Sequence, residues 1–368
     1  MSSQARCYVE ISRSRIASNY RVVRDSVAPF AQVIGVVKAN AYGHGMLEVA
    51  RLLCAEGIPW LAVSSVDEGI ALRGAGIECR VLVMAGVMPW ERSAVGEYRL
   101  TPVLHSLDEL KHFGGVRVHL KIDTGMDRLG TLASADQIAR ALQASPTVVV
   151  EGLMSHFASA SDFTSTQTEE QIGAFRRMAA ALAERGIHPE LMHFSSTNAI
   201  AYPRREAWMQ LVRPGHSLYG YVSPARGTAP HAAFAVEPAL TWKARIIAVK
   251  DLPAGARVGY GGSYVAEAPM KIAVLAVGYA DGFPHRLSNK GKVIAGGRFA
   301  PIVGTVSMDV TTIDVSQSPE MKAGDAVTLL GREGEVSLDA MQIARTAGTI
   351  SYNVLASIGA RVQRVYVE

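Results

Sequence analysis

The feature that most limits the possible folds is a regular alternation between short apolar runs and segments with helical spacing. Seven runs have the length and apolar content of buried strands: Trp60–Val63, Val81–Met84, Leu100–Val103, Val116–Ile122, Val148–Met154, Leu191–Phe194 and Gln210–Val212. An eighth begins at Val33 and ends before Lys38. Helical patterns precede or separate most of them: Arg13–Val27, Met46–Cys54, Val66–Ala75, Pro89–Tyr98, Leu107–Phe113, Ala135–Ala144 and Glu169–Arg185. Eight parallel strands with helical crossovers predict an α/β fold, a (β/α)8 TIM-type barrel over residues 12–233.

A doubly wound parallel sheet is the competing architecture, because it shows the same alternation. The dinucleotide-binding members of that class carry a GxGxxG sequence after the first strand, and no such sequence follows Val33–Val37. A chain of 368 residues also exceeds most single cores, so we expect a second domain.

The second domain is predicted after the loop-rich segment SPARGTAPHAAF. From Ala239 the chain alternates apolar and polar residues in short runs, with Gly and Asp turns between them. One helix, Leu338–Ala347, interrupts this pattern, and Arg361–Val367 is the last strand candidate. Residues 234–368, together with an N-terminal strand (Tyr8–Ile11) from residues 1–11, are therefore expected to form a mostly β domain.

Composition excludes several classes of protein. The net charge is only +4, and no Lys/Arg block alternates with aromatic residues, so nucleic acid is not an expected partner. The three cysteines, Cys7, Cys54 and Cys79, lack a CxxC spacing, which disfavours disulfides and a cysteine metal site and fits a reducing compartment. No apolar stretch suits a signal peptide or a membrane span, so we expect a soluble cytoplasmic protein.

The stretch VIGVVKANAYGHG places Lys38 at the end of a buried strand. Burial disfavours the charged ammonium, so the pKa of Lys38 should fall and its amine become nucleophilic, as in lysines that form imines. The alternative is a lysine whose long stem lets the charge reach solvent. The glycines of the following turn allow a backbone to approach a ligand closely, which favours a binding role.

A barrel carries its chemistry at the carboxyl ends of its strands. Polar residues gather at those positions: Lys38, Ser64–Ser65, His105, Lys121–Asp123, Ser155–His156, His193, Ser196–Thr197 and Arg213–Gly215. The turn at Gly215 and His216 has backbone N–H groups suited to a phosphate, and the Thr197 hydroxyl can join them. An imine-forming lysine beside a phosphate site predicts pyridoxal 5'-phosphate as the cofactor.

Eight motifs together resemble the alanine racemase family, whose members are fold-type III enzymes that use pyridoxal phosphate. In order they are VVKANAYGHG, KIDTGMDRLG, MSHFASASD, VRPGHSLYG, VGYGGSY, GYADGFPH, GTVSMDV and ISYNVLASI. The resemblance runs from about Tyr8 to the C-terminus. It implies an isomerase that interconverts L-alanine and D-alanine by a two-base mechanism on the cofactor imine and supplies D-alanine for peptidoglycan.

The resemblance assigns the two catalytic bases to Lys38 and Tyr260. It also implies a homodimer with shared active sites, in which the partner subunit supplies Tyr260 and the substrate-binding residues Met308 and Asp309, the former through its backbone. Tyrosine has an ordinary pKa of about 10 and is a weak base at neutral pH, so nearby arginine charge would have to lower it. Without the other motifs, the sequence around Tyr260 favours a turn aromatic in a Gly-rich hairpin over a catalytic residue.

The remaining cofactor-binding positions follow from the same resemblance. The phosphate-binding set comprises Tyr42, Thr197, Tyr352 and the backbone of Gly215 and His216. Arg213 matches the arginine that faces the pyridine nitrogen; because arginine stays protonated in proteins, it leaves that nitrogen without a proton. Arg128 matches a residue near the cofactor phenolate and the substrate carboxylate, and His156 matches a position beside Arg213 or the ring.

Lys121 matches a lysine that carries a carbamate in many relatives, and pairing with Asp123 is the open alternative. Two positions depart from the usual pattern: Ser196 stands where many relatives have asparagine, and Ser307 where cysteine is common. Three other functions are compatible with parts of the sequence: a broader racemase for serine or basic amino acids, a non-catalytic pyridoxal-phosphate carrier, and a metal-dependent barrel hydrolase. The last would use carboxylated Lys121, His156, His193 and Asp309; we expect no metal.

Overall fold

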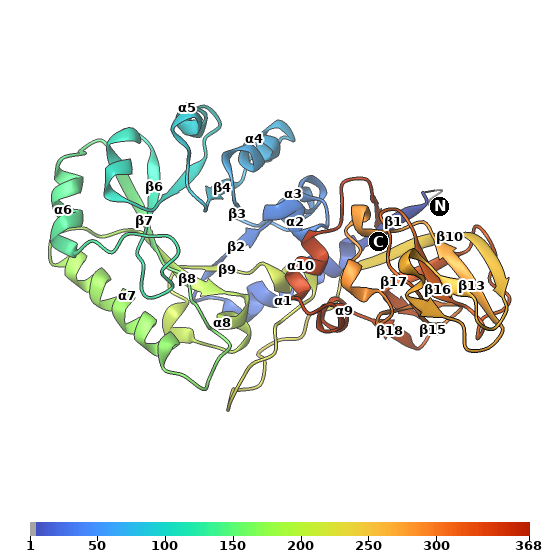
Figure 1. Ribbon diagram of the computed structural model, residues 1–368. Helices are drawn as coiled ribbons and strands as arrows, with labels where there is room; N and C mark the ends of the chain where they lie inside the picture. Colours follow the sequence, from blue (N-terminus) through green and yellow to red (C-terminus); the bar gives the residue numbers. More distant parts are fainter. Residues whose placement is uncertain (1–4) are drawn as a thin grey trace. The chain divides into compact units, whose positions relative to one another are not determined.

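The computed structural model describes residues 5–368, which form two compact units (Figure 1). The barrel unit comprises Arg15–Ala41 and Met46–Glu237. The β unit comprises residues 5–14, Tyr42–Gly45 and Pro238–Glu368. The chain therefore passes from the barrel unit to the β unit and back within the loop that follows Lys38.

The barrel unit contains a closed barrel of eight parallel strands, which confirms the predicted fold class and excludes the doubly wound sheet. Its strands are β2 (Gln32–Val36), β3 (Trp60–Val63), β4 (Arg80–Val83), β5 (Thr101–Leu104), β6 (Arg117–Lys121), β7 (Val149–Met154), β8 (Leu191–Ser196) and β9 (Leu211–Arg213). The barrel closes where Val33 on β2 pairs with Val212 on β9. Their central residues are almost entirely buried, as their apolar content requires.

Helices separate the strands: α1 (Arg13–Val27), α3 (Met46–Ala55), α4 (Val66–Gly74), α5 (Arg92–Glu97), α6 (Ala135–Gln143), α7 (Gln167–Ala183) and α8 (Thr197–Ala201). Local sequence explains where several helices begin. At the start of α6, for example, the Ser134 hydroxyl accepts from the Gln137 N–H, and the Gln137 side-chain oxygen accepts from the Ser134 N–H. Two predicted helices are less regular. Pro89–Tyr98 divides into a 3₁₀ turn and α5, and Leu107–His112 is a 3₁₀ helix.

The β unit is built on a nine-stranded sheet with the central order β15-β14-β17-β10-β1-β19. Its strands are β1 (Cys7–Ser12), β10 (Leu240–Leu252), β13 (Met270–Leu275), β14 (Lys292–Ala295), β15 (Arg298–Pro301), β16 (Thr311–Asp314), β17 (Ala326–Glu333), β18 (Val336–Leu338) and β19 (Gln363–Val367). A separate hairpin joins β11 (Arg257–Val258) to β12 (Tyr264–Val265). The N-terminal strand lies between β10 and β19, as part of this sheet.

The prediction of a single helix in this unit is wrong. α9 (Ala340–Ala347) matches it, but a second helix, α10 (Ser351–Ala356), follows. α10 is short and lies one glycine-containing turn after α9, so periodicity over six residues could not identify it. Within residues 5–368, no helix is both long and apolar enough to cross a membrane.

Candidate active site

Lys38 follows β2 and begins a left-handed turn labelled α2 (Lys38–Tyr42). Ala39, Asn40 and Ala41 each have a φ of 53°, and Tyr42 has a φ of 52°. Residues with a Cβ are disfavoured in this conformation by about 1–2 kcal/mol each. Such strain persists only where surrounding contacts hold it, and it is concentrated at functional sites.

Two side chains hold the turn. The Glu68 carboxylate on α4 accepts hydrogen bonds from the Ala39 N–H and the Ser64 N–H, both at 2.7 Å. Asn40 Oδ1 accepts from the Met46 N–H at the start of α3, at 2.8 Å. The ends of β2 and β3 are thereby fixed to one carboxylate. Sequence reasoning missed this role of Glu68. In the sequence, Glu68 is only the last residue of a Ser-x-x-Glu pattern, which is typical of a helix start.

The environment of Lys38 favours a neutral amine. Burial and the Arg128 guanidinium lower the pKa of Lys38, while the Glu68 carboxylate acts in the opposite direction. This is the direction that the strand-end position predicts.

Arg213, the last residue of β9, is buried, and its two Nη atoms make four hydrogen bonds. Its Nη2 donates to the carbonyls of Ser155 (2.7 Å) and Phe194 (3.0 Å) and to His156 Nδ1 (3.2 Å). Its Nη1 donates to His193 Nδ1 at 2.6 Å. Burial lowers the pKa of Arg213 to about 9, so the guanidinium remains charged at neutral pH.

A chain of buried side chains continues from Arg213 through the barrel. Because His193 Nδ1 accepts from Arg213, the proton of His193 lies on Nε2, which donates to His119 Nδ1 at 2.6 Å. The His119 proton then lies on Nε2, 3.8 Å from Glu151 Oε2. Burial raises the pKa of Glu151, but the facing His119 and Arg80 more than offset this and bring it to about 2. Sequence reasoning missed His119 and Glu151.

The two histidines that contact Arg213 are neutral. Burial and the Arg213 charge hold the pKa of His156, and that of His193, well below the ordinary value. Both nitrogens of His193 are engaged in the chain just described, so neither has a lone pair available for a metal. Among residues 5–368 no cluster of three potential metal ligands is present. The donor geometry therefore disfavours the metal-dependent hydrolase.

The predicted phosphate donors of the barrel unit gather around Thr197. Its Oγ1 accepts from the backbone N–H of Gly215 (3.1 Å) and of Ser217 (3.3 Å), and lies 3.3 Å from Ser217 Oγ. The Val36 N–H donates to the Pro214 carbonyl, which joins this turn to the strand that carries Lys38. His216 is buried in the same turn, and Ser217 was missed by sequence reasoning because serine is common in turns of every kind.

Lys121 ends β6 and is buried. Burial and the charges of Arg213 and Arg128 lower the pKa of Lys121 to about 8. The Asp123 carboxylate does not pair with Lys121. Its Oδ1 accepts from the backbone N–H groups of residues 125–127, and Lys121 forms no ion pair within residues 5–368. Ser196 lies beside Arg213 in the register of β8 and β9.

In the β unit, two predicted phosphate-binding tyrosines lie together. The rings of Tyr42 and Tyr352 have centroids 6.0 Å apart. Gly43 makes this approach possible, since it has a φ of 82° and a Cβ there would lie 2.2 Å from the Leu355 carbonyl oxygen. The segment Tyr42–Gly45 is thus packed directly against α10 within the β unit.

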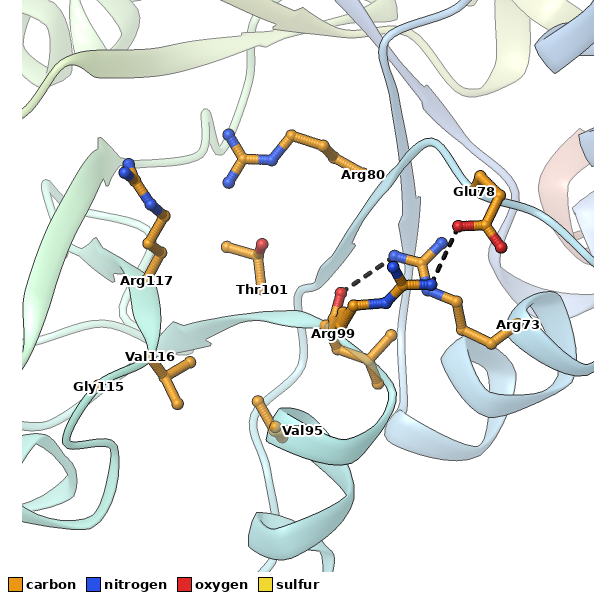
Figure 2. Close-up of a pocket in the computed structure, with 11 residues that line it drawn as sticks. Arg73, Glu78, Arg80, Val95, Arg99, Thr101, Gly115, Val116 and Arg117 are labelled. Carbon is orange, nitrogen blue, oxygen red and sulfur yellow. Dashed lines mark hydrogen bonds and ion pairs between the residues drawn. The ribbon is translucent and has the colours of Figure 1, made fainter.

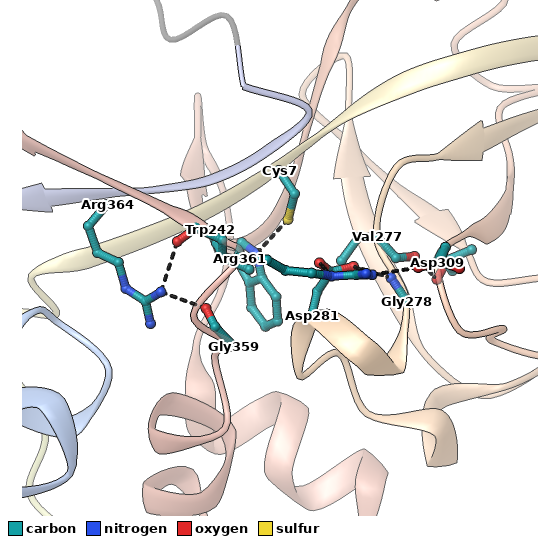
Figure 3. Close-up of polar contacts among 11 residues, drawn as sticks. Cys7, Trp242, Val277, Gly278, Asp281, Asp309, Gly359, Arg361 and Arg364 are labelled. Atoms are coloured by element: carbon teal, nitrogen blue, oxygen red, sulfur yellow. Dashed lines mark hydrogen bonds and ion pairs between the residues drawn. The ribbon is translucent and has the colours of Figure 1, made fainter.

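Two motifs of the β unit form one structure around Gly278 (Figure 3). A Cβ on Gly278 would lie 2.3 Å from the carbonyl oxygens of both Ser307 and Met308, so only glycine permits this contact. Arg361 joins the same loops by donating to Asp281 at 2.6 Å and to Asp309 at 2.7 Å (Figure 3). The Asp309 carboxylate is thereby directed to Arg361, which suits a role in positioning the Met308 backbone.

Tyr260 lies in the turn of the β11–β12 hairpin, close to the same loop. Thr305 Oγ1 lies 3.0 Å from Ser263 Oγ and donates to the Tyr260 carbonyl at 3.5 Å. Tyr260 is 77% exposed and Met308 is 53% exposed. Two of the predicted site residues therefore stand on the surface of the β unit.

The predicted residues thus fall into two sets. The barrel set lies at the carboxyl ends of the strands and comprises Lys38, Lys121, Arg128, His156, Thr197, Arg213, Gly215 and His216. The β-unit set comprises Tyr42, Tyr260, Met308, Asp309 and Tyr352.

Comparison with known proteins gives one consistent result. Residues 11–224 match the family described as "Alanine racemase, N-terminal domain", and residues 239–366 match "Alanine racemase, C-terminal domain". The chain is 39% identical to an alanine racemase of Syntrophobacter fumaroxidans over 364 residues, 96% of each chain. It is also 39% identical to one of Carboxydothermus hydrogenoformans over 371 residues, 98% and 99% of the two chains.

Solved structures agree. An alanine racemase from Streptomyces lavendulae has a TM-score of 0.91 and 33% identity, with 100% of this chain and 98% of that chain covered. An alanine racemase from Bartonella henselae, solved with covalently bound pyridoxal phosphate, has a TM-score of 0.87 and 27% identity, with coverage of 99% and 100%.

Proposed function

The chain belongs to the alanine racemase family, and from this membership we propose that it interconverts L-alanine and D-alanine with pyridoxal phosphate. It matches both domains of the family, and this disfavours the carrier alternative, which would have only a barrel. One observation carries the proposal. Lys38, whose pKa is lowered, lies beside the end of β9, where Arg213 and the Gly215 N–H bonded to Thr197 are found.

The residues present fit the cofactor. Lys38 offers an amine for its aldehyde carbon, and the donors around Thr197 and Gly215 suit its phosphate. Arg213 is buried and keeps its proton at neutral pH, which suits a pyridine nitrogen without one. When bound, pyridoxal phosphate supplies the electron sink that acidifies the Cα–H bond of the amino acid.

The protein residues perform the remaining tasks. Lys38 Nζ would hold the cofactor and would take or return the Cα proton on one face. Arg213 is fixed in orientation by its four hydrogen bonds, and beside a bound cofactor it would leave the ring nitrogen unprotonated. Glu68 fixes the backbone that carries Lys38. Arg128 supplies positive charge for the substrate carboxylate and lowers the pKa of Lys38.

A racemase needs a second base on the opposite face of Cα. Tyr260 has the required hydroxyl but is 77% exposed in the single chain, and Met308 is 53% exposed. Burial by a second copy of this chain would give both residues a dry environment. We therefore assign the second base to Tyr260 of the partner subunit, in a homodimer with two shared sites.

The test of function is direct. The purified protein should show a visible band near about 420 nm from bound cofactor. L-Alanine should give equal amounts of both enantiomers at equilibrium, monitored by circular dichroism. A panel that includes serine, lysine and arginine decides the broader-racemase alternative. Absence of the band and of racemisation of every substrate would reject the proposal.

The biological setting follows from the reaction. D-Alanine made by this protein would supply peptidoglycan synthesis. The three cysteines are free thiols, which fits the proposed cytoplasmic location.

A further inference from the structure

The barrel has a second polar site, at the opposite end of its strands from Lys38. A pocket of about 360 Å³ opens beside the first residues of β4, β5 and β6, which are Arg80, Thr101 and Arg117. Arg73, Arg99 and Glu78 also line it (Figure 2). We call this the arginine pocket.

The arginine pocket has more positive than negative charge. Arg80 and Arg117 share a single carboxylate, Glu151, and Arg99 pairs with Glu78 at 3.0 Å. Arg73 instead donates to backbone carbonyls, those of residues 77, 79, 98 and 99. Four guanidinium groups therefore face two carboxylates, which leaves an excess of two positive charges.

Arg80 and Arg117 differ in how firmly their side chains are held. Arg80 makes two bonds to Glu151, at 2.6 and 2.5 Å, and its guanidinium lies 3.8 Å from the centroid of the Trp60 ring, so it is fixed. Arg117 makes one contact of 3.3 Å, and its side chain is 57% exposed, so it can turn toward a ligand at little cost. Thr101 stands on the middle strand between them (Figure 2).

A structural role accounts for only part of this arrangement. A buried Glu151 needs a cationic partner, and Arg80 satisfies both of its oxygens. Neither Arg117 nor the unneutralised charge of Arg73 is required for that purpose. Fixed guanidinium groups with spare charge around a concave space are the usual means of recognising carboxylates and phosphates.

We propose that the arginine pocket binds a compact oxyanion of charge minus two, a phosphate or a small dicarboxylate, between Arg80 and Arg117 with the Thr101 hydroxyl as a further donor. The pocket volume of about 360 Å³ suits such a ligand with several waters. The site is separate from the proposed racemase chemistry, because its residues belong to the amino ends of the barrel strands.

Calorimetric titration of the cofactor-loaded protein with inorganic phosphate, and separately with succinate, tests the proposal. Ionic strength is held constant, and saturating alanine and bound cofactor keep the carboxylate and phosphate sites near Lys38 filled. Arg117→Ala removes the mobile guanidinium. Arg140→Ala is the matched control, since Arg140 is exposed on α6 and lines no part of the pocket.

We expect saturable binding of at least one of the two anions. Arg117→Ala should weaken it by about tenfold or more, as loss of a charged hydrogen bond predicts, and Arg140→Ala should leave it unchanged. Binding of phosphate alone or succinate alone identifies the ligand class. Absence of binding by both anions, or equal affinity in Arg117→Ala and the parent, would overturn the proposal. The titration measures anion affinity and not racemisation. A protein that fails to racemise alanine can therefore still bind the anion, and the two proposals can fail independently.

Discussion

Nη1 of Arg213 lies 2.6 Å from Nδ1 of His193, inside the barrel. Because a guanidinium has only donors, this contact makes His193 Nδ1 an acceptor and places its proton on Nε2. The same contact gives Arg213 a fixed orientation at the end of β9. The orientation of the arginine proposed to face the cofactor therefore depends on a histidine one strand away.

His193→Leu should destabilise the protein by about 1–3 kcal/mol, because it leaves a buried, charged donor of Arg213 without its acceptor. The proposed arrangement also predicts a lower kcat, since Arg213 loses one of the bonds that fix it. Urea unfolding and steady-state racemisation measure the two effects. His188→Leu, on the surface, is the control. Equal unfolding free energies for the two variants would show that the contact contributes nothing.

Lys38→Ala should abolish racemisation and the covalent attachment of the cofactor, since no other amine stands at the end of β2. Borohydride reduction followed by mass spectrometry measures attachment. Lys111→Ala, which removes an exposed lysine, should retain both properties. Cofactor trapped on Lys38→Ala at the parent's yield would mean that another lysine is used.

The barrel could be predicted from sequence because its eight strands are short, mostly apolar and regularly spaced, and their central residues are buried. Because the strand boundaries were clear, the polar residues that follow each strand could be placed at one end of the barrel. The chain from Arg213 through His193 and His119 to Glu151 was not, because it joins residues up to 94 positions apart through side-chain contacts alone. α10 was missed because six residues contain less than two full helical turns.

Lys121 should make stability depend on pH and on carbon dioxide. Its pKa is lowered to about 8 from the ordinary value of 10.5, so its charge opposes folding below pH 8, and this penalty disappears as pH rises from 8 to 10.5. A neutral amine reacts with CO₂, and the resulting carbamate anion would suit the adjacent Arg213 and Arg128 charges. Bicarbonate should therefore stabilise the parent at pH 8 by about 1 kcal/mol or more.

The control for this prediction is Lys121→Met, which lacks the amine. Its stability should not respond to bicarbonate, and it should lose the increase in unfolding free energy between pH 8 and 10.5. Thermal and urea unfolding in CO₂-depleted and bicarbonate buffers measure both properties. An equal bicarbonate effect in the two proteins would contradict carbamate formation at Lys121.

Gly278→Ala should displace the loop that carries Met308, because its Cβ would lie 2.3 Å from two backbone oxygens of that loop. We expect a raised KM for alanine and a loss of stability of about 1–3 kcal/mol, typical of overpacking. Gly96→Ala is the control, since a Cβ there meets nothing within 4 Å. A Gly278→Ala enzyme with parental KM and stability would show that the loops separate at little cost.

We propose that Lys38 of one subunit and Tyr260 of the partner subunit act on opposite faces of the same substrate. Mixing inactive Lys38→Ala with inactive Tyr260→Ala subunits tests it most directly. Random reassortment makes about half of the dimers hybrids, each with one intact site, so roughly a quarter of the parental activity should return. If both bases came from one chain, no hybrid would contain an intact site. Zero recovery after demonstrated subunit exchange would contradict the shared site.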